Sequence, residues 1–146
     1  MHMELNFDLG IKEYTVKGAN GNMVIRFCPT DANFARRAYE TFNILEKKHK
    51  ERAEHINENT SNEDAFEFTA KIDAEMRDAI DELFGCPICG GIFGTINLYA
   101  SAGGSPIWLN FMNAVIDQFD DEIKRERFLA GEKAKKYTNK YTNHVV

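Results

Sequence analysis

Residues 80 to 112 read IDELFGCPICGGIFGTINLYASAGGSPIWLNFM. This stretch joins the apolar end of one helical pattern to the start of another, and it holds six of the ten glycines of the chain. Its middle is too apolar for a flexible linker, because side chains such as Ile92, Phe93 and Leu98 would be left in water. We therefore expect this junction to fold onto the core and to fix how the flanking helices meet.

Two long helical patterns precede the junction. The first begins after a cap formed by Thr30 or Asp31 and runs from about Ala32 to about Glu58. The second begins at a cap formed by Ser61 or Asn62 and ends at Gly85. Each carries apolar residues at spacings of three and four, which make one face of an amphipathic helix. The short polar loop between them predicts an antiparallel helical hairpin.

Residues Glu4 to Phe27 have the pattern of strands. Leu5, Phe7 and Leu9 alternate with polar residues, which is the period of a half-buried strand. A turn rich in Gly and Asn at residues 17–22 then predicts a β-hairpin that returns as far as Phe27. Two strands alone are only marginally stable, so the hairpin should pack on the helices.

A third helix is predicted after the junction, with Ser105 as its cap and Pro106 in its first turn. The sequence thus predicts an α+β fold, in which an N-terminal β-hairpin packs on a mainly α-helical bundle of three principal helices. The residues expected in one shared core are Leu83, Phe84, Trp108 and Phe111.

The length of 146 residues fits one domain. We expect residues 1–130 to form a single globular domain and residues 131–146 to form a basic, flexible C-terminal tail, in which a polar Tyr-Thr-Asn triplet occurs twice. The net charge of -5 argues against nucleic acid as a partner, and no apolar run is long enough to cross a membrane. Three cysteines, an odd number, suit a reducing cytoplasm.

The sharpest local motif is Cys-Pro-Ile-Cys-Gly, which starts at Cys86. Its turn could aim the thiolates of Cys86 and Cys89 at one zinc ion. A structural zinc site needs four ligands, and the chain has no second Cys-x-x-Cys motif. Cys28 could serve as a third ligand and His49 or His55 as a fourth, but only if folding gathers them. Two partly buried thiols in a tight turn are the favoured interpretation, and a redox pair is the least favoured.

No catalytic constellation is visible in the sequence. The glycines do not form a phosphate-binding loop, and the acidic residues of the second helix lack calcium-loop spacing. His49 and His55 fall on a charged helical surface and are interpreted as solvated residues. The chain is therefore predicted not to be an enzyme.

Four segments of the chain form a recognisable set: FCPTDANF at 27–34, IDELFG at 80–85, IFGTIN at 92–97 and PIWLNFMNA at 106–114. Together they resemble a family of small tail proteins from phages that infect Gram-positive bacteria, the tail assembly chaperones. The resemblance covers the chain from about residue 11 to about residue 123.

The resemblance implies a non-enzymatic helper in the host cytoplasm that is absent from the finished virion. Such proteins coat the long tape measure protein and recruit tail-tube subunits, and some are also made in a longer, frameshifted form. A homo-oligomer is left open, and the resemblance assigns no contact residues and no cofactor. The alternative is a small zinc-binding protein-interaction module or a phage-encoded inhibitor of a host protein, which a metal assay would distinguish.

Overall fold

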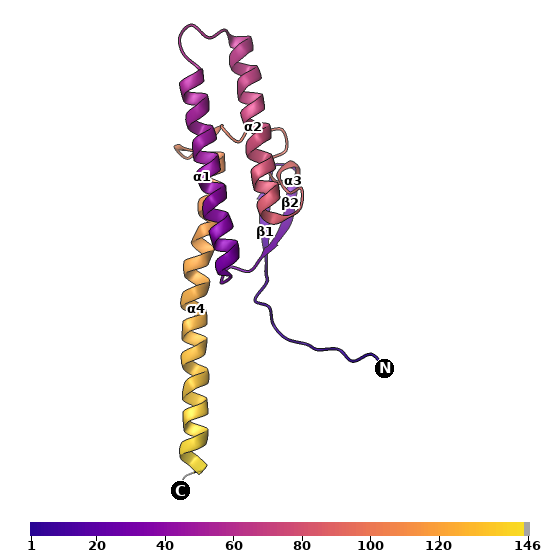
Figure 1. Cartoon of the computed structure of the whole chain (residues 1–146), viewed down its shortest axis with the longest axis vertical. Coiled ribbons are helices and arrows are strands. Elements are labelled where there is room, and N and C mark those ends of the chain that lie inside the picture. Colours follow the sequence, from indigo (N-terminus) through magenta and orange to yellow (C-terminus); the bar gives the residue numbers. More distant parts are fainter. Residues whose placement is uncertain (145–146) are drawn as a thin grey trace.

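The structure, a computed structural model, describes the backbone of residues 1–144 and the side chains of residues 1–136. The elements in chain order are β1 (Lys12–Gly18), β2 (Gly21–Phe27), α1 (Ala32–His55), α2 (Asn62–Phe84), α3 (Cys89–Phe93), β3 (Ser101–Ala102), β4 (Ser105–Pro106) and α4 (Ile107–His144). The fold is α+β, as predicted: an antiparallel β-hairpin is followed by mainly helical segments. Figure 1 shows α1 and α2 side by side, with α4 running away from this pair to the far end of the molecule.

The β-hairpin packs on the helices through its inner face. β1 and β2 pair with Lys12 opposite Phe27 and Tyr14 opposite Ile25. Ile25 and Phe27 are both buried. The Phe27 ring lies between Tyr14, at a centroid distance of 4.6 Å, and Phe34 of α1, at 4.9 Å. These stacked rings anchor the otherwise marginal two-stranded sheet to the bundle.

The strand predicted before residue 10 is absent from the described fold. Residues 1–11, here called the N-terminal arm, have no regular secondary structure. The side chains of Leu5, Phe7 and Leu9 are 89%, 75% and 64% exposed. Alternation predicts which face of a strand is apolar, but a strand also needs a neighbour for its backbone groups. The arm has no such neighbour among residues 1–144.

The helical hairpin forms where the caps predicted it. The carboxylate of Asp31 accepts the N–H of Asn33 at the start of α1, and Ser61 Oγ accepts the N–H of Asp64 at the start of α2. Gly85 ends α2 in the left-handed conformation, as expected. The two helices are antiparallel, and their loop forms one end of the molecule in Figure 1.

The junction after α2 folds onto the core, as predicted. Ile88, Ile92, Phe93 and Leu98 are buried, whereas Ile96 is 47% exposed. The short helix α3 and the small β3–β4 hairpin lie within this junction and were not predicted. The glycines of the junction therefore belong to compact turns of a folded segment and not to a flexible linker.

The predicted cap of the third helix is corrected by the structure. Ser105 and Pro106 belong to β4, and α4 begins at Ile107. The N–H of Ile107 donates to the carbonyl of Ala100 at 2.8 Å. A backbone group of the folded junction thus satisfies the free N–H at the start of α4, which a serine side chain was expected to do.

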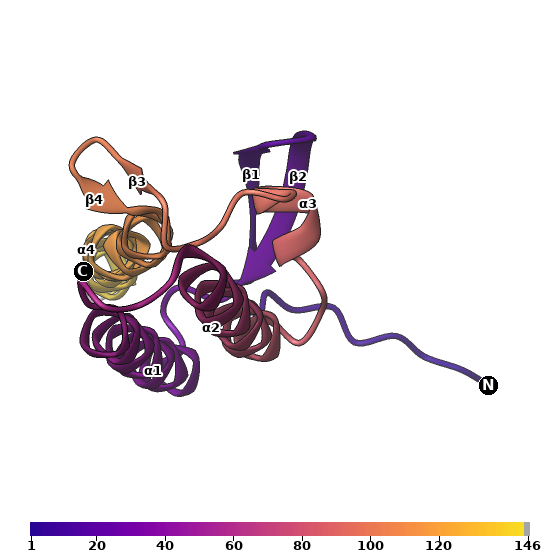
Figure 2. The same ribbon diagram turned by 90° about the horizontal axis from the view of Figure 1, so that it is seen from above.

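The shared core is confirmed. Trp108 and Leu83 are 3% and 4% exposed. Phe84 and Phe111 are partly buried against this core, with their ring centroids 6.0 Å apart. Viewed from above in Figure 2, α1, α2 and α4 lie together, and the β1–β2 hairpin stands beside α3 at one side of α2.

The expected C-terminal tail overlaps α4. The helix continues through residue 131 to His144, so the segment has regular structure where an unstructured tail was expected. Residues 124–136 are rich in Lys, Arg, Glu and Ala, which favour helix even without packing. Residues 145 and 146 lie outside the described part. The flexibility of this segment and the domain boundary at residue 130 stay predictions.

Candidate interaction surfaces and the cysteine turn

One carboxylate holds the turn between α2 and α3. Asp81 Oδ1 accepts the backbone N–H groups of Ile88 and Cys89, at 3.0 and 2.9 Å. These N–H groups belong to the start of α3, where no carbonyl of the helix itself can reach them. Asp81 therefore ties the last turn of α2 to the first turn of α3.

The two thiols of the cysteine turn face different surroundings. Cys86 is exposed, whereas Cys89 is 1% exposed and its thiol donates to the carbonyl of Arg77 at 3.5 Å. Burial, reinforced by the nearby carboxylate of Asp81, raises the pKa of the Cys89 thiol far above its usual value. The raised pKa holds Cys89 in the unreactive thiol form. Metal ions bind the thiolate, so Cys89 is a poor ligand in this state.

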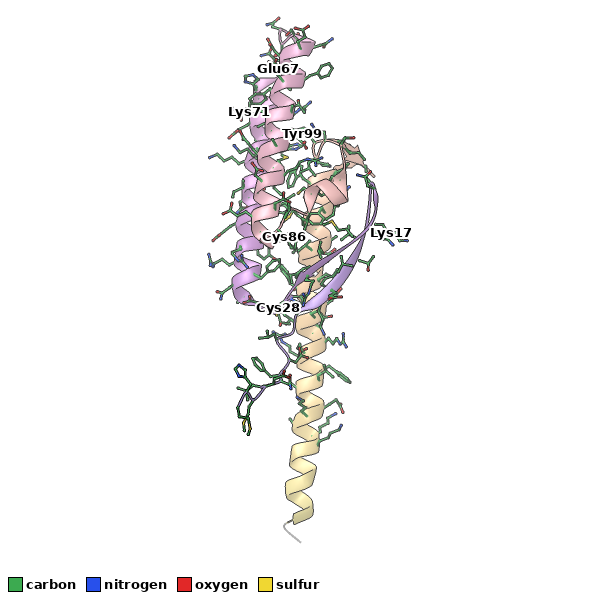
Figure 3. The ribbon with its side chains drawn as sticks, turned by 90° about the vertical axis from the view of Figure 1, so that its right-hand side faces the viewer. Lys17, Cys28, Glu67, Lys71, Cys86 and Tyr99 are labelled. Atoms are coloured by element: carbon green, nitrogen blue, oxygen red, sulfur yellow. The ribbon has the colours of Figure 1, made fainter. Side chains whose placement is uncertain are left out.

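The other residues considered as zinc ligands are not gathered at this turn. Figure 3 labels Cys28 and Cys86 at separate levels of the molecule. The thiol of Cys28 lies 3.5 Å from both the carbonyl of Leu9 and the hydroxyl of Thr30. Within the described residues, no three His, Cys, Asp or Glu side chains come together as a metal site would require. Zinc binding by Cys86 and Cys89 is left to direct measurement.

A second carboxylate of α2 holds the far side of the junction. Asp73 Oδ1 accepts the N–H of Leu98 at 2.7 Å, and its Oδ2 accepts from Nε of Arg77 at 2.9 Å. The guanidinium of Arg77 in turn donates to the carbonyl of Ile96 at 2.6 Å. The acidic run of α2 is thus not one uniform solvated face, because Asp73 and Asp81 are used to position the junction.

His49 is not the solvated residue that the sequence suggested. Its ring stacks on Tyr99 with centroids 4.3 Å apart, and its Nδ1 accepts a hydrogen bond from Trp108 Nε1 at 3.1 Å. The hydroxyl of Tyr99 also donates to the His49 carbonyl at 2.6 Å. Burial, together with the positive charge of Arg52, lowers the pKa of His49. No local signal predicts this cluster, because Tyr99 and Trp108 are distant from His49 in the sequence.

The outer side of the helical hairpin carries a shallow groove, here called the α1–α2 groove. It has a volume of about 340 Å³. Its apolar members include Ile44, which is 45% exposed, and Ala79 and Leu83. Glu40 and Glu82 border it and are exposed to solvent. Arg37 also lines the groove, and Glu40 forms an exposed ion pair with Arg36 at 2.9 Å. The groove therefore combines an apolar centre with edges that carry two acidic residues and one basic residue.

Two further regions expose apolar side chains. The N-terminal arm is the first. The second is the part of α4 beyond the core, where Phe128 and Leu129 are 66% and 42% exposed. From residue 124 to residue 136 this part of α4 carries six basic and two acidic residues, so its charge is opposite to that of the α1–α2 groove.

Comparison with protein-family models, with curated proteins and with solved structures found no match for this chain. Among the described residues, no helix is both long and apolar enough to cross a membrane. The surfaces above must therefore be interpreted from their own chemistry.

Proposed function

We propose that this protein is a phage tail assembly chaperone that binds the tape measure protein and helps to recruit tail-tube subunits. It acts in the host cytoplasm and leaves before the virion is complete. The observation that supports this proposal is the α1–α2 groove, in which Ile44 is accessible between the acidic residues Glu40 and Glu82. The resemblance noted in the sequence supplies the identity of the partner.

The groove suits one face of an amphipathic helix. A helix that lies in a groove inserts apolar side chains at spacings of three and four and leaves its charged residues at the edges. A tape measure helix exposes apolar stripes until the tail tube closes around it, so it needs temporary cover. Lysines beside those stripes would meet Glu40 and Glu82, and such contacts weaken as salt is added.

A single groove of about 340 Å³ offers few contacts. Copies of this chain that also contact one another would bind one extended partner more strongly, because each bound copy raises the effective concentration of the copy joined to it. The basic end of α4 stands away from the groove and offers a separate surface for a tail-tube subunit. A chaperone of this kind needs no catalytic residue and no cofactor.

The test is co-expression with the tape measure protein of the same phage. We expect the tape measure protein to become soluble and to co-purify with this chain at low salt. Ile44→Asp should abolish both effects, because it places a charge in the apolar centre of the groove. Ile96→Asp is the matched control, since Ile96 is 47% exposed but lies on the junction outside the groove.

Two results would refute the proposal. The first is a tape measure protein that is equally soluble with and without this chain and does not co-purify with it. The second is an Ile44→Asp variant that is folded by circular dichroism and supports solubility as well as the Ile96→Asp variant does.

A further inference from the structure

A second groove lies at the end of the core from which the N-terminal arm departs, here called the foot groove. It has a volume of about 450 Å³. Arg26 and Arg37 border it, and the Arg37 guanidinium lies 5.6 Å from the centroid of the Phe34 ring. The aromatic and aliphatic residues that line it are Phe27, Phe34, Leu83 and Phe84.

The charges at the foot groove leave Arg37 available. Arg26 forms an exposed ion pair with Glu13 at 3.5 Å, which is weak in water. Asp31 also lines the groove, but its carboxylate is already used to cap α1. Arg37 is bonded to no carboxylate among the ion pairs of the described residues. The groove is therefore apolar inside and basic at its edge.

The N-terminal arm has the opposite character. Its apolar side chains Leu5, Phe7 and Leu9 are largely exposed. Its charged side chains are Glu4 and Asp8, and residues 1–11 contain no Lys or Arg. The segment and the groove are thus both apolar, and their charges are opposite in sign, as they would be in a complementary interface.

Residues 9–11 lie at the edge of the chain's own foot groove, which Ile11 helps to line, whereas residues 1–8 are directed away from it (Figure 1). Gly10 has φ +73, a conformation that favours glycine, and its N–H donates to Asp8 Oδ1 at 2.7 Å. The carbonyl of Leu9 is held by the thiol of Cys28 at 3.5 Å. Figure 1 shows the result: the arm leaves the body of the molecule and ends far from it.

We propose that two copies of this chain exchange arms, so that residues 3–8 of one copy lie in the foot groove of the other. An extended segment of six residues reaches roughly 20 Å, which is enough to cross to a neighbouring copy. The groove and the arm lie at the same end of the molecule. A two-fold axis at that end would therefore place each arm in the groove of the other copy. The inference rests on the arm and the groove and does not depend on the phage function.

The first experiment measures the mass of the full chain by sedimentation at micromolar concentration. We expect twice the chain mass of 16.7 kDa at low salt and dissociation as salt is raised. Phe7→Ser should weaken the dimer at least about tenfold. Phe66→Ser is the matched control, because Phe66 is 73% exposed against 75% for Phe7 but lies on α2. A monomeric wild type, or equal weakening by both variants, would overturn the proposal.

The second experiment distinguishes exchange from an arm that folds back. Leu5→Cys and Phe7→Cys are each made with Cys86→Ser, which leaves Cys28 in the foot groove as the accessible partner. Mild oxidation should give a covalent dimer linked from the new cysteine to Cys28. The dimer should disappear when Cys28→Ser is added. A link within one chain, or no link to Cys28 at either position, would overturn the proposal.

Discussion

Nε1 of Trp108 donates a hydrogen bond to Nδ1 of His49 at 3.1 Å, which joins α4 to α1. The bond requires a lone pair on Nδ1, and a doubly protonated imidazole has none there. Arg52 places its guanidinium 4.1 Å from the centroid of the Tyr99 ring, the ring on which His49 stacks. The folded state therefore favours neutral His49.

Stability should fall when the pH drops below the ordinary pKa of histidine. His49 has a lowered pKa in the folded protein, so the unfolded chain binds the proton more readily. The stabilisation from neutral His49 is complete above about pH 6.5 and is lost as the pH falls through the lowered pKa of the folded state. Urea unfolding at several pH values between about 7.5 and 5.5 measures this pH dependence of the free energy of unfolding.

The variant His49→Asn isolates this residue. Asparagine can present a carbonyl oxygen near the position of Nδ1 but does not titrate. Its stability should be lower at pH 7.5, because the stack on Tyr99 is lost, and should change less with pH than that of the wild type. An unchanged slope in the variant would assign the pH dependence to other groups.

Asp81→Ala should destabilise the fold by about 1–2 kcal/mol, the usual cost of losing a helix cap. Asp81 accepts two N–H groups at the start of α3. Alanine removes both bonds and leaves the N–H of Cys89 without this acceptor, whereas the N–H of Ile88 keeps its bond to the Cys86 carbonyl. Asp78→Ala, on the same helix but exposed, should change the free energy of unfolding by less than about 0.5 kcal/mol. Equal effects in chemical denaturation would mean that the Asp81 contacts contribute little.

The cysteines of the turn should react at very different rates. Iodoacetamide should modify Cys86 of the native protein at mildly alkaline pH and leave Cys89 intact, because Cys89 is buried and its pKa is raised. Mass spectrometry of the peptides measures this.

Elemental analysis should find no stoichiometric zinc. About one zinc per chain, lost when Cys86 and Cys89 are replaced by Ser, would support the zinc-module alternative instead.

Gly18→Ala should cost about 1–3 kcal/mol, the range typical of overpacking. A Cβ at Gly18 would lie 2.8 Å from the carbonyl oxygen of Gly91 and 3.0 Å from Cα of Ile92, and backbone cannot yield as a side chain can. Gly90→Ala is the control, because a Cβ there meets nothing within 4 Å. Thermal unfolding should separate the variants, and two equal melting temperatures would mean that the hairpin can shift away from α3.

Local sequence signals determined the main elements. Asp31 and Ser61 cap the helices, and Gly85 ends α2. These features could be predicted because each residue acts on backbone groups within a few residues of itself. The apolar periods of the helices likewise predicted core residues such as Leu83 and Trp108. The junction was correctly expected to be folded, since its apolar side chains could not remain in water.

Only the tertiary structure decided what depends on residues far apart. The arm has the alternation of a strand but no neighbouring strand among residues 1–144. Asp81 holds the start of α3 although it belongs to the last turn of α2. His49 is tied to residues of two later segments, which the charged sequence around it does not reveal. Periodicity and capping report interactions within one segment, whereas pairing, burial and pKa are set by whichever distant groups the fold brings into contact.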